Sequence, residues 1–141
     1  MSARHSDTGF TLIELLMVVT IIVVVAAVAV PGLLRARMAG DEASAMGSLR
    51  AIISGQSTYA VACGAGGYAQ VLEDLAKAPA GARAGFVSPD LSTTPSVKSG
   101  FVVSLAADSG AFAVASSTHT CNGATNDAVS SYFAEAHPAT A

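Results

Sequence analysis

The chain has 141 residues, of which 52% are hydrophobic and 12% are charged. This length is enough for one globular domain of modest size, and the composition is too apolar for a disordered chain, so it favours a membrane or a polymer as the setting. The formal net charge is -3, whereas nucleic-acid binding requires lysine and arginine clustered on one face. We therefore predict no nucleic-acid partner.

Residues 10–30 form an apolar run that only one charged residue interrupts. About twenty apolar residues are what a helix needs to cross the hydrocarbon core of a membrane, so we predict a transmembrane helix there. A secretory signal peptide is the alternative, but its apolar region is shorter and follows a basic segment. Residues 1–9 are short and polar, with Arg4 and His5 partly balanced by Asp7, which favours the transmembrane helix.

Glu14 is the charged residue within that run. An ionised carboxylate in an apolar setting is costly and normally has a partner or a function. If the chain were cut between Gly9 and Phe10, the new α-amino group of Phe10 would lie about one helical turn from Glu14 and supply a positive charge. The pair would neutralise both charges, either within one chain or between neighbouring chains.

One segment resembles the prepilin peptidase site of type IV pilins and of type II secretion pseudopilins: Gly9-Phe10-Thr11-Leu12-Ile13-Glu14-Leu15. In that family a membrane aspartyl protease cuts after the glycine and N-methylates the new first residue. The resemblance therefore implies cleavage between Gly9 and Phe10 and methylation of Phe10. It also implies a role in assembly for Glu14, the fifth mature residue, and for Pro31, which takes the place of the family's helix proline.

This resemblance implies a structural subunit of a helical filament and not an enzyme. The expected partners are identical or related pilin subunits, the prepilin peptidase, the inner-membrane assembly platform and, before assembly, the lipid bilayer. The expected location is the bacterial inner membrane with the head outside, and then a pilus or a periplasmic pseudopilus of type II secretion. The alternative is a monomeric membrane-anchored binding module outside the cytoplasm, which would be neither cut at Gly9 nor polymerised.

The arginine count opposes this orientation. Arg35 and Arg37 follow the apolar run, whereas Arg4 and the initiator amine precede it, and the positive-inside rule places the more basic flank in the cytoplasm. The processing motif is the more specific signal, and the peptidase of that family acts on the cytoplasmic side. We therefore expect the part of the chain beyond the apolar run to face outward.

The helix is expected to continue beyond the transmembrane half as an amphipathic half over residues 31–62. Pro31 and Gly32 predict a kink or local melting, since proline removes a backbone hydrogen bond; the alternative is that Pro31 ends the helix. Spacings of three, four or seven define an apolar stripe that should pack on the head: Leu34, Met38, Ala45, Leu49, Ile52 and Tyr59. The polar face carries Arg35, Arg37, Asp41, Glu42 and Arg50.

The expected fold is α+β, in which residues 63–141 form a head with a small antiparallel sheet packed on the second half of the long helix. Gly-rich residues after Ala62 end the helix, and β-branched, aromatic and turn residues mark the strands. The predicted elements of the head are a short helix over residues 71–76, a loop through Pro89 and Pro95, strands over residues 100–106 and 111–116 with a turn at Asp108-Ser109-Gly110 between them, and a strand over residues 129–134. The last five residues predict no further strand.

Cys63 and Cys121 are the two cysteines of the chain. Disulfides persist outside the cytoplasm, so an exported head predicts one bridge between them. Such a bridge would close a loop of about sixty residues and stabilise the head by roughly 4 kcal/mol in the chain-entropy model. Two free thiols are the alternative.

No catalytic residue, metal site or cofactor is predicted. A nucleophile, a base and an orienting group do not assemble from His5, His119, His137 and the scattered serines. His119 near Cys121 falls short of the four ligands of a structural zinc site. Calcium, which some pseudopilins bind in a C-terminal loop, is a minor alternative to ordinary turn residues for the oxygen-bearing side chains of Asp108, Asn122, Asn126 and Asp127.

Overall fold

The computed structural model describes residues 9–139. Residues 1–8, which include most of the expected leader with Arg4 and His5, and residues 140–141 lie outside the described part. The chain divides between Ala39 and Gly40 into two compact units. The first unit holds the N-terminal half of one long helix, and the second holds the rest of that helix and every other element.

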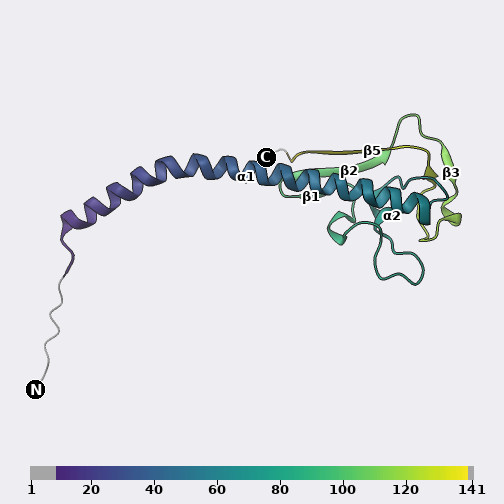
Figure 1. Ribbon diagram of the computed structural model, residues 1–141, viewed down its shortest axis with the longest axis horizontal. Coiled ribbons are helices and arrows are strands. Elements are labelled where there is room, and N and C mark those ends of the chain that lie inside the picture. Colours follow the sequence, from purple (N-terminus) through teal and green to yellow (C-terminus); the bar gives the residue numbers. More distant parts are fainter. Residues whose placement is uncertain (1–8, 140–141) are drawn as a thin grey trace, which may run out of the picture. The chain divides into compact units, whose positions relative to one another are not determined.

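The long helix α1 (Leu12–Ala62) has 51 residues and contains Pro31 (Figure 1). The helical backbone is continuous through Pro31 and Gly32, which confirms the expected continuation of the helix. Local melting and the alternative of a helix end were wrong, and the kink stays a prediction. Proline removes one N–H from the ladder, whereas ending a helix inside an apolar run would leave several backbone groups without partners. Continuation is therefore the less costly arrangement.

The helix ends at Ala62, as predicted, because the next residues allow a backbone reversal. The N–H of Gly64 donates to the carbonyl of Tyr59 at 2.7 Å, and the N–H of Gly66 donates to the carbonyl of Ala60 at 2.8 Å. Gly66 has a φ of 92°, which glycine adopts without the penalty that a Cβ brings.

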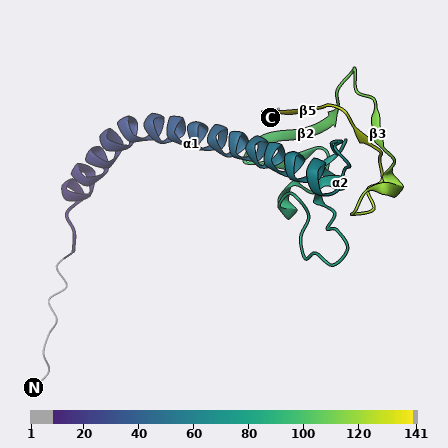
Figure 2. The same ribbon diagram turned by 45° about the vertical axis from the view of Figure 1, so that its right-hand side comes forward.

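The second unit contains a short helix and two small antiparallel sheets, which confirms the α+β class (Figures 1 and 2). In the larger sheet β2 lies between β1 and β5, and in the smaller one β3 pairs with β4. The elements are α2 (Leu72–Ala76), β1 (Ser96–Lys98), β2 (Phe101–Ala107), β3 (Ala113–Ala115), β4 (Ala128–Val129) and β5 (Tyr132–Pro138), with 3-10 turns at Pro89–Leu91 and Ser117–His119.

The single predicted sheet is in fact two sheets. The strand expected over residues 129–134 contains the end of β4 and the start of β5, which belong to different sheets. Ser130 and Ser131 separate them: the N–H of Ser130 donates to the carbonyl of Phe112, and the carbonyl of Ser131 accepts from Asp108. β5 then continues to Pro138, where no strand was expected.

The strand β1 lies in a segment that was expected to be loop. It pairs with β2 through Lys98 and Phe101, with Ser99 and Gly100 as the two loop residues. Both have positive φ, 50° and 75°, the backbone of the two-residue hairpin turns that suit twisted strands. The Ser-Gly pair between two β-prone stretches was the signal for this hairpin.

The core of the second unit lies between α1, α2 and the larger sheet. Its most completely buried side chains include Ile52 and Tyr59 of α1, Leu72 and Leu75 of α2, and Val103 and Leu105 of β2.

The apolar stripe predicted on α1 was right in its second half only. Ala45, Ile52 and Tyr59 are buried and Leu49 is half-buried. Leu34 and Met38 are 59% and 52% exposed, so placing them against the head was wrong. Both precede Gly40, where the second unit begins.

Three buried positions on α1 lie between the predicted ones: Ser48, Gly55 and Gln56. The side-chain amide of Gln56 donates to the carbonyl of Ala69 at 2.7 Å and accepts from its N–H at 2.9 Å. This exchange satisfies both groups of a buried amide and both backbone groups of the loop residue, as buried polar groups require. A polar side chain thus anchors the first loop of the head to the helix.

Candidate functional site

The expected cleavage position is exposed and lies just before α1. Gly9 and Phe10 are not in the helix, and the Phe10 side chain is 85% exposed. A Cβ placed on Gly9 would meet no atom within 4 Å. Within the described residues, nothing therefore covers the peptide bond between Gly9 and Phe10.

Thr11 and Glu14 cap the start of α1. The hydroxyl of Thr11 accepts from the backbone N–H of Glu14 at 3.4 Å and donates its own proton to Oε2 of Glu14 at 3.2 Å. This arrangement is related to the capping box, and a carboxylate in the first turn also favours the positive end of the helix dipole. The spacing Thr-x-x-Glu was its sequence signal, and Glu14 therefore has a structural role that the sequence analysis did not name.

The structure does not bring a cation to Glu14 within the described residues. The nitrogen of Phe10 is in a peptide bond with Gly9, so it carries no charge in this form of the chain. The expected pair between the Phe10 amine and Glu14 requires cleavage first. It remains a prediction about the processed chain.

From Leu15 to Val30, α1 is apolar around its whole circumference. An 18-residue window of the helix has a mean hydropathy of 3.0, and none of that window is buried. The large side chains of this stretch are exposed, including Leu16, Ile22 and Val28 at 61%, 60% and 78%. A helix that is apolar on all sides requires an apolar surrounding, either lipid or other helices. This helix is long and apolar enough to cross a membrane.

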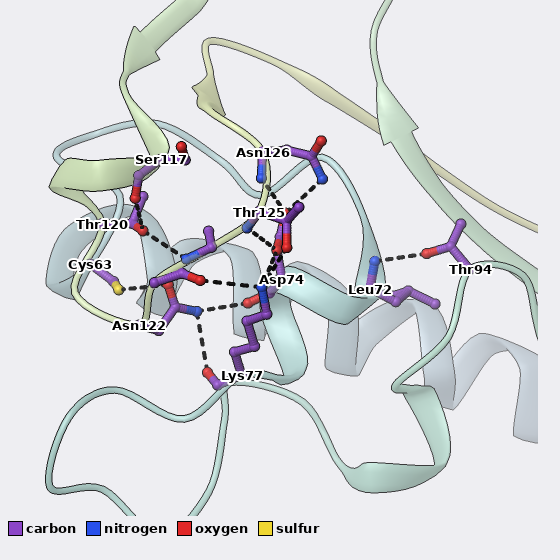
Figure 3. Close-up of polar contacts among 12 residues, drawn as sticks. Cys63, Leu72, Asp74, Lys77, Thr94, Ser117, Thr120, Asn122, Thr125 and Asn126 are labelled. Carbon is purple, nitrogen blue, oxygen red and sulfur yellow. Dashed lines mark hydrogen bonds and ion pairs between the residues drawn. The ribbon is translucent and has the colours of Figure 1, made fainter.

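The second unit centres on the buried carboxylate of Asp74, which is 1% exposed (Figure 3). Its Oδ1 accepts from the N–H of Thr125 at 2.6 Å and from the ammonium of Lys77 at 3.2 Å. Its Oδ2 accepts from the N–H and the side-chain amide of Asn126 at 3.0 and 2.8 Å. Burial alone would raise the pKa of Asp74, but these hydrogen bonds outweigh burial and lower it.

The ammonium of Lys77 is held by oxygens from three residues. Besides Asp74 it contacts the carbonyl of Gly123 at 3.2 Å and the hydroxyl of Thr125 at 2.6 Å. Asn122 adds a further link, since its side-chain amide donates to the carbonyls of Asp74 and Lys77 at 2.7 and 3.2 Å. α2 is thereby fastened to the loop that precedes β4 (Figure 3).

Cys63 and Cys121 form a disulfide, with their Cα atoms 4.7 Å apart. The bridge joins the end of α1 to the same loop that Asp74 holds. The Sγ of Cys63 lies 3.5 Å from Oδ1 of Asn122, a contact without a hydrogen bond because a disulfide sulfur carries no proton. The disulfide and the Asp74 cluster therefore fasten one loop from two sides.

The side chains considered for metal binding have separate partners. Asp127 accepts from the N–H of Ser117, Asp108 accepts from the N–H of Ser109, and Asn122 and Asn126 bind the Asp74 segment. His119 is exposed in the 3-10 turn. Among residues 9–139 the structure contains no group of three or more histidine, cysteine or carboxylate side chains that could hold a metal ion.

A shallow depression of about 340 Å³ lies beside α2 and is lined by Val71, Glu73, Asp74, Thr94, Thr125 and Asn126. Oε1 of Glu73 accepts from the N–H of Thr94 at 2.6 Å. Burial would raise the pKa of Glu73, but the hydrogen bonds with Thr94 outweigh it and lower the pKa. Both carboxylates of the depression thus serve internal hydrogen bonds.

These features define an α+β protein with one apolar helix fit for a membrane and a small head that a disulfide braces. A family model described as the prokaryotic N-terminal methylation motif matches residues 4–30. The chain therefore carries the signature of type IV pilins and pseudopilins, a group of structural proteins. Neither the curated proteins nor the solved structures include a match to this chain.

Proposed function

We propose that the chain is a type IV pilin-like structural subunit of a bacterial filament. The prepilin peptidase removes residues 1–9 and methylates the new amino group of Phe10. The subunit then waits in the inner membrane with its head outside until the assembly platform adds it to a pilus or a type II secretion pseudopilus. The observation that carries this proposal is the methylation motif at residues 4–30, which includes the start of the helix α1 and most of its apolar stretch.

Helix packing is the physical basis of assembly. An apolar helix gains little hydrophobic free energy by leaving lipid for other apolar helices, so close packing and specific polar pairs must supply the preference. The amine of Phe10 and the carboxylate of Glu14 would neutralise one another in that setting. A heterologous contact that does not close on itself produces an open helical polymer, which is the form of a filament.

The head supports this role because it is braced from within. The disulfide and the hydrogen bonds of Asp74 hold the loop between β3 and β4. A subunit that must leave the membrane and then pack against its neighbours benefits from a head that does not unfold locally.

The test is the intact mass and N-terminal sequence of the protein from cells that carry the processing peptidase. We expect a chain that begins at Phe10 and is one methyl group heavier than the unmodified sequence. A Gly9→Val variant should stay uncut, whereas Gly40→Val should be cut normally. Both glycines have open space where a Cβ would lie, so neither change should be rejected for steric reasons.

The opposite result has a clear meaning. A wild-type chain that keeps residues 1–9 and forms no polymer would overturn the proposed function. It would favour the monomeric membrane-anchored binding module instead.

A further inference from the structure

One face of α1 is hollowed near the end of its apolar run. A shallow depression of about 190 Å³ is lined there by residues three or four positions apart: Val30, Leu33, Leu34 and Arg37. All four belong to the first compact unit. The three apolar side chains are 62%, 59% and 59% exposed. Arg37 is exposed and makes no ion pair within residues 9–139, so the depression has apolar walls and one positive charge at its edge.

The depression lies at the depth where the headgroups of a membrane begin. Between Glu14 and Arg35 the chain has twenty residues without a charge, and a helix of that length spans about 30 Å at about 1.5 Å per residue. The hydrocarbon core of a bilayer has this thickness, so the two charges lie at its two boundaries. The apolar walls then face the acyl chains, and the long side chain of Arg37 reaches the phosphates.

We propose that this depression, which we call the lipid groove, binds one phospholipid of the outer leaflet while the subunit is in the membrane. An acyl chain lies against Val30, Leu33 and Leu34, and the guanidinium of Arg37 binds the phosphate. A guanidinium can hold two phosphate oxygens with parallel hydrogen bonds. This inference rests on the membrane stage of the proposed function and adds a ligand to it.

The charge of the groove favours a lipid over a second copy of the chain. A side chain from another helix could fill the space between the apolar walls. A copy inserted at the same depth, however, brings its own Arg35 and Arg37 to this level, and like charges would then lie close together. A phospholipid supplies an acyl chain and an anionic phosphate in the order in which the groove offers its apolar walls and its cation.

Two other features of the same helix provide internal comparisons. Arg35 precedes Arg37 by two residues, about 3 Å along the axis, but it does not line the groove. A second depression, of about 230 Å³, contains no charged side chain and is lined by Thr20, Ile21, Val24 and Val25. A binding site at the groove requires Arg37 specifically, whereas a general attraction of cations to lipid would depend equally on both arginines.

The test is native mass spectrometry of the full-length protein in detergent micelles, with phosphatidylglycerol added in steps, because each bound lipid adds its own mass. We expect Arg37→Gln to bind the first phosphatidylglycerol about fivefold more weakly than the wild type, the factor for one arginine near an anionic membrane surface. Arg35→Gln removes the same charge outside the groove and should bind as the wild type does.

Two further variants test the apolar walls without changing a charge. Val30→Phe places a larger side chain in the lipid groove and should weaken binding, although Arg37 is retained. Val24→Phe makes the same change in the second depression and should not. An excess of inorganic phosphate should leave the lipid bound, since the free ion offers no acyl chain.

Four outcomes would overturn this inference: equal weakening by Arg37→Gln and Arg35→Gln, unchanged binding in Arg37→Gln, displacement of the lipid by inorganic phosphate, or a wild-type protein dimer in place of a lipid adduct. Equal effects of Val30→Phe and Val24→Phe would remove the assigned role of the apolar walls. Failure of the proposed function is distinguishable, because the wild-type chain would then remain uncut or form no filament, whatever lipid it binds. The disulfide, measured in the same spectra, verifies that the head of each variant is folded.

Discussion

Asp74 receives two hydrogen bonds from one residue, Asn126: the backbone N–H and the side-chain amide lie 3.0 and 2.8 Å from its Oδ2. The two residues are separated by 52 positions in the chain. Oδ1 also accepts hydrogen bonds, from Thr125 and Lys77. Both oxygens of this buried carboxylate therefore have hydrogen-bond donors. Asp74 is therefore the polar centre of the head.

Asp74→Asn should destabilise the head by about 2–4 kcal/mol, since the new amide group would face donors and leave them unsatisfied. The matched control is Asp90→Asn, which removes an exposed ion pair with Lys98 and should cost less than about 1 kcal/mol. Urea unfolding of the full-length protein in detergent measures both. Equal losses in the two variants would contradict the assigned importance of Asp74.

The stability of the head should fall in acid. The pKa of Asp74 is lowered because the hydrogen bonds to its charged form outweigh burial. A group with a lowered folded pKa stabilises the protein above its unfolded pKa, about 3.9 for aspartate, and loses that contribution as pH falls through the folded pKa. The urea midpoint should therefore decrease as pH is lowered from about 5 towards 2. In Asp74→Asn the urea midpoint should decrease less as pH falls. Glu73, whose pKa is also lowered, should account for part of the remaining decrease.

Removal of the disulfide should cost about 4 kcal/mol in the chain-entropy model, since Cys63 and Cys121 are 58 positions apart in the chain. The double variant Cys63→Ser with Cys121→Ser removes the bridge and leaves no unpaired thiol that could cross-link two chains. Its free energy of unfolding is compared with that of the wild-type protein, which is also unfolded with and without a reductant. Unchanged stability in the double variant would show that the Asp74 cluster alone holds the loop.

Two glycines of α1 should respond in opposite ways to alanine. A Cβ at Gly55 would lie 2.7 Å from the backbone carbonyl oxygen of Phe86, whereas a Cβ at Gly47 would meet no atom within 4 Å. Gly55→Ala should destabilise by about 1–3 kcal/mol through overpacking, and Gly47→Ala should stabilise by about 0.5–1 kcal/mol. Thermal unfolding of the two variants checks the difference, and equal shifts would mean that Phe86 gives way freely.

Substitutions at Glu14 and Thr11 distinguish the role of the charge in the first turn of α1 from the role of the hydrogen bonds that cap the helix. Glu14→Gln keeps a side chain that can accept from Thr11 but removes the carboxylate, so we expect cleavage at Gly9 without assembly. Thr11→Ala removes the cap at a cost of about 1 kcal/mol to the helix and should still assemble. Measuring both the filament yield and the N-terminal mass of each variant distinguishes the loss of the charge from the loss of the cap. Normal filaments from Glu14→Gln would contradict the role assigned to the charge.

The N-terminal part of the protein could be predicted because its signals are local. The length of the apolar run, the isolated Glu14 and the glycine before Phe10 each act within one or two helical turns. The end of α1 at Ala62 was predicted for the same reason, since glycine needs no distant partner to reverse the chain. The continuation of α1 through Pro31 was predicted from the apolar spacing that follows, whereas the local melting was wrong because one lost hydrogen bond does not interrupt the helix there.

The sheets of the head could be predicted only in part. In residues 129–134 the β propensity comes from Val129, Tyr132 and Phe133. The two serines between them do not by themselves indicate that the stretch is divided between β4 and β5. Propensity indicates that a stretch is extended, whereas the choice of partner strand depends on packing against residues far away in the chain. The β1–β2 hairpin is the exception, since Ser99 and Gly100 are a local turn signal that could have predicted it.

The sequence by itself determined the apolar helix and the methylation motif at its start, because both are properties of consecutive residues. Only the tertiary structure decided that Asp74 binds Asn126, that Gln56 binds Ala69, and that Cys63 meets Cys121. Each of these pairs joins residues at least thirteen positions apart. Such contacts form only when buried polar groups find partners during packing, and a buried polar group without a partner costs more than most single interactions gain.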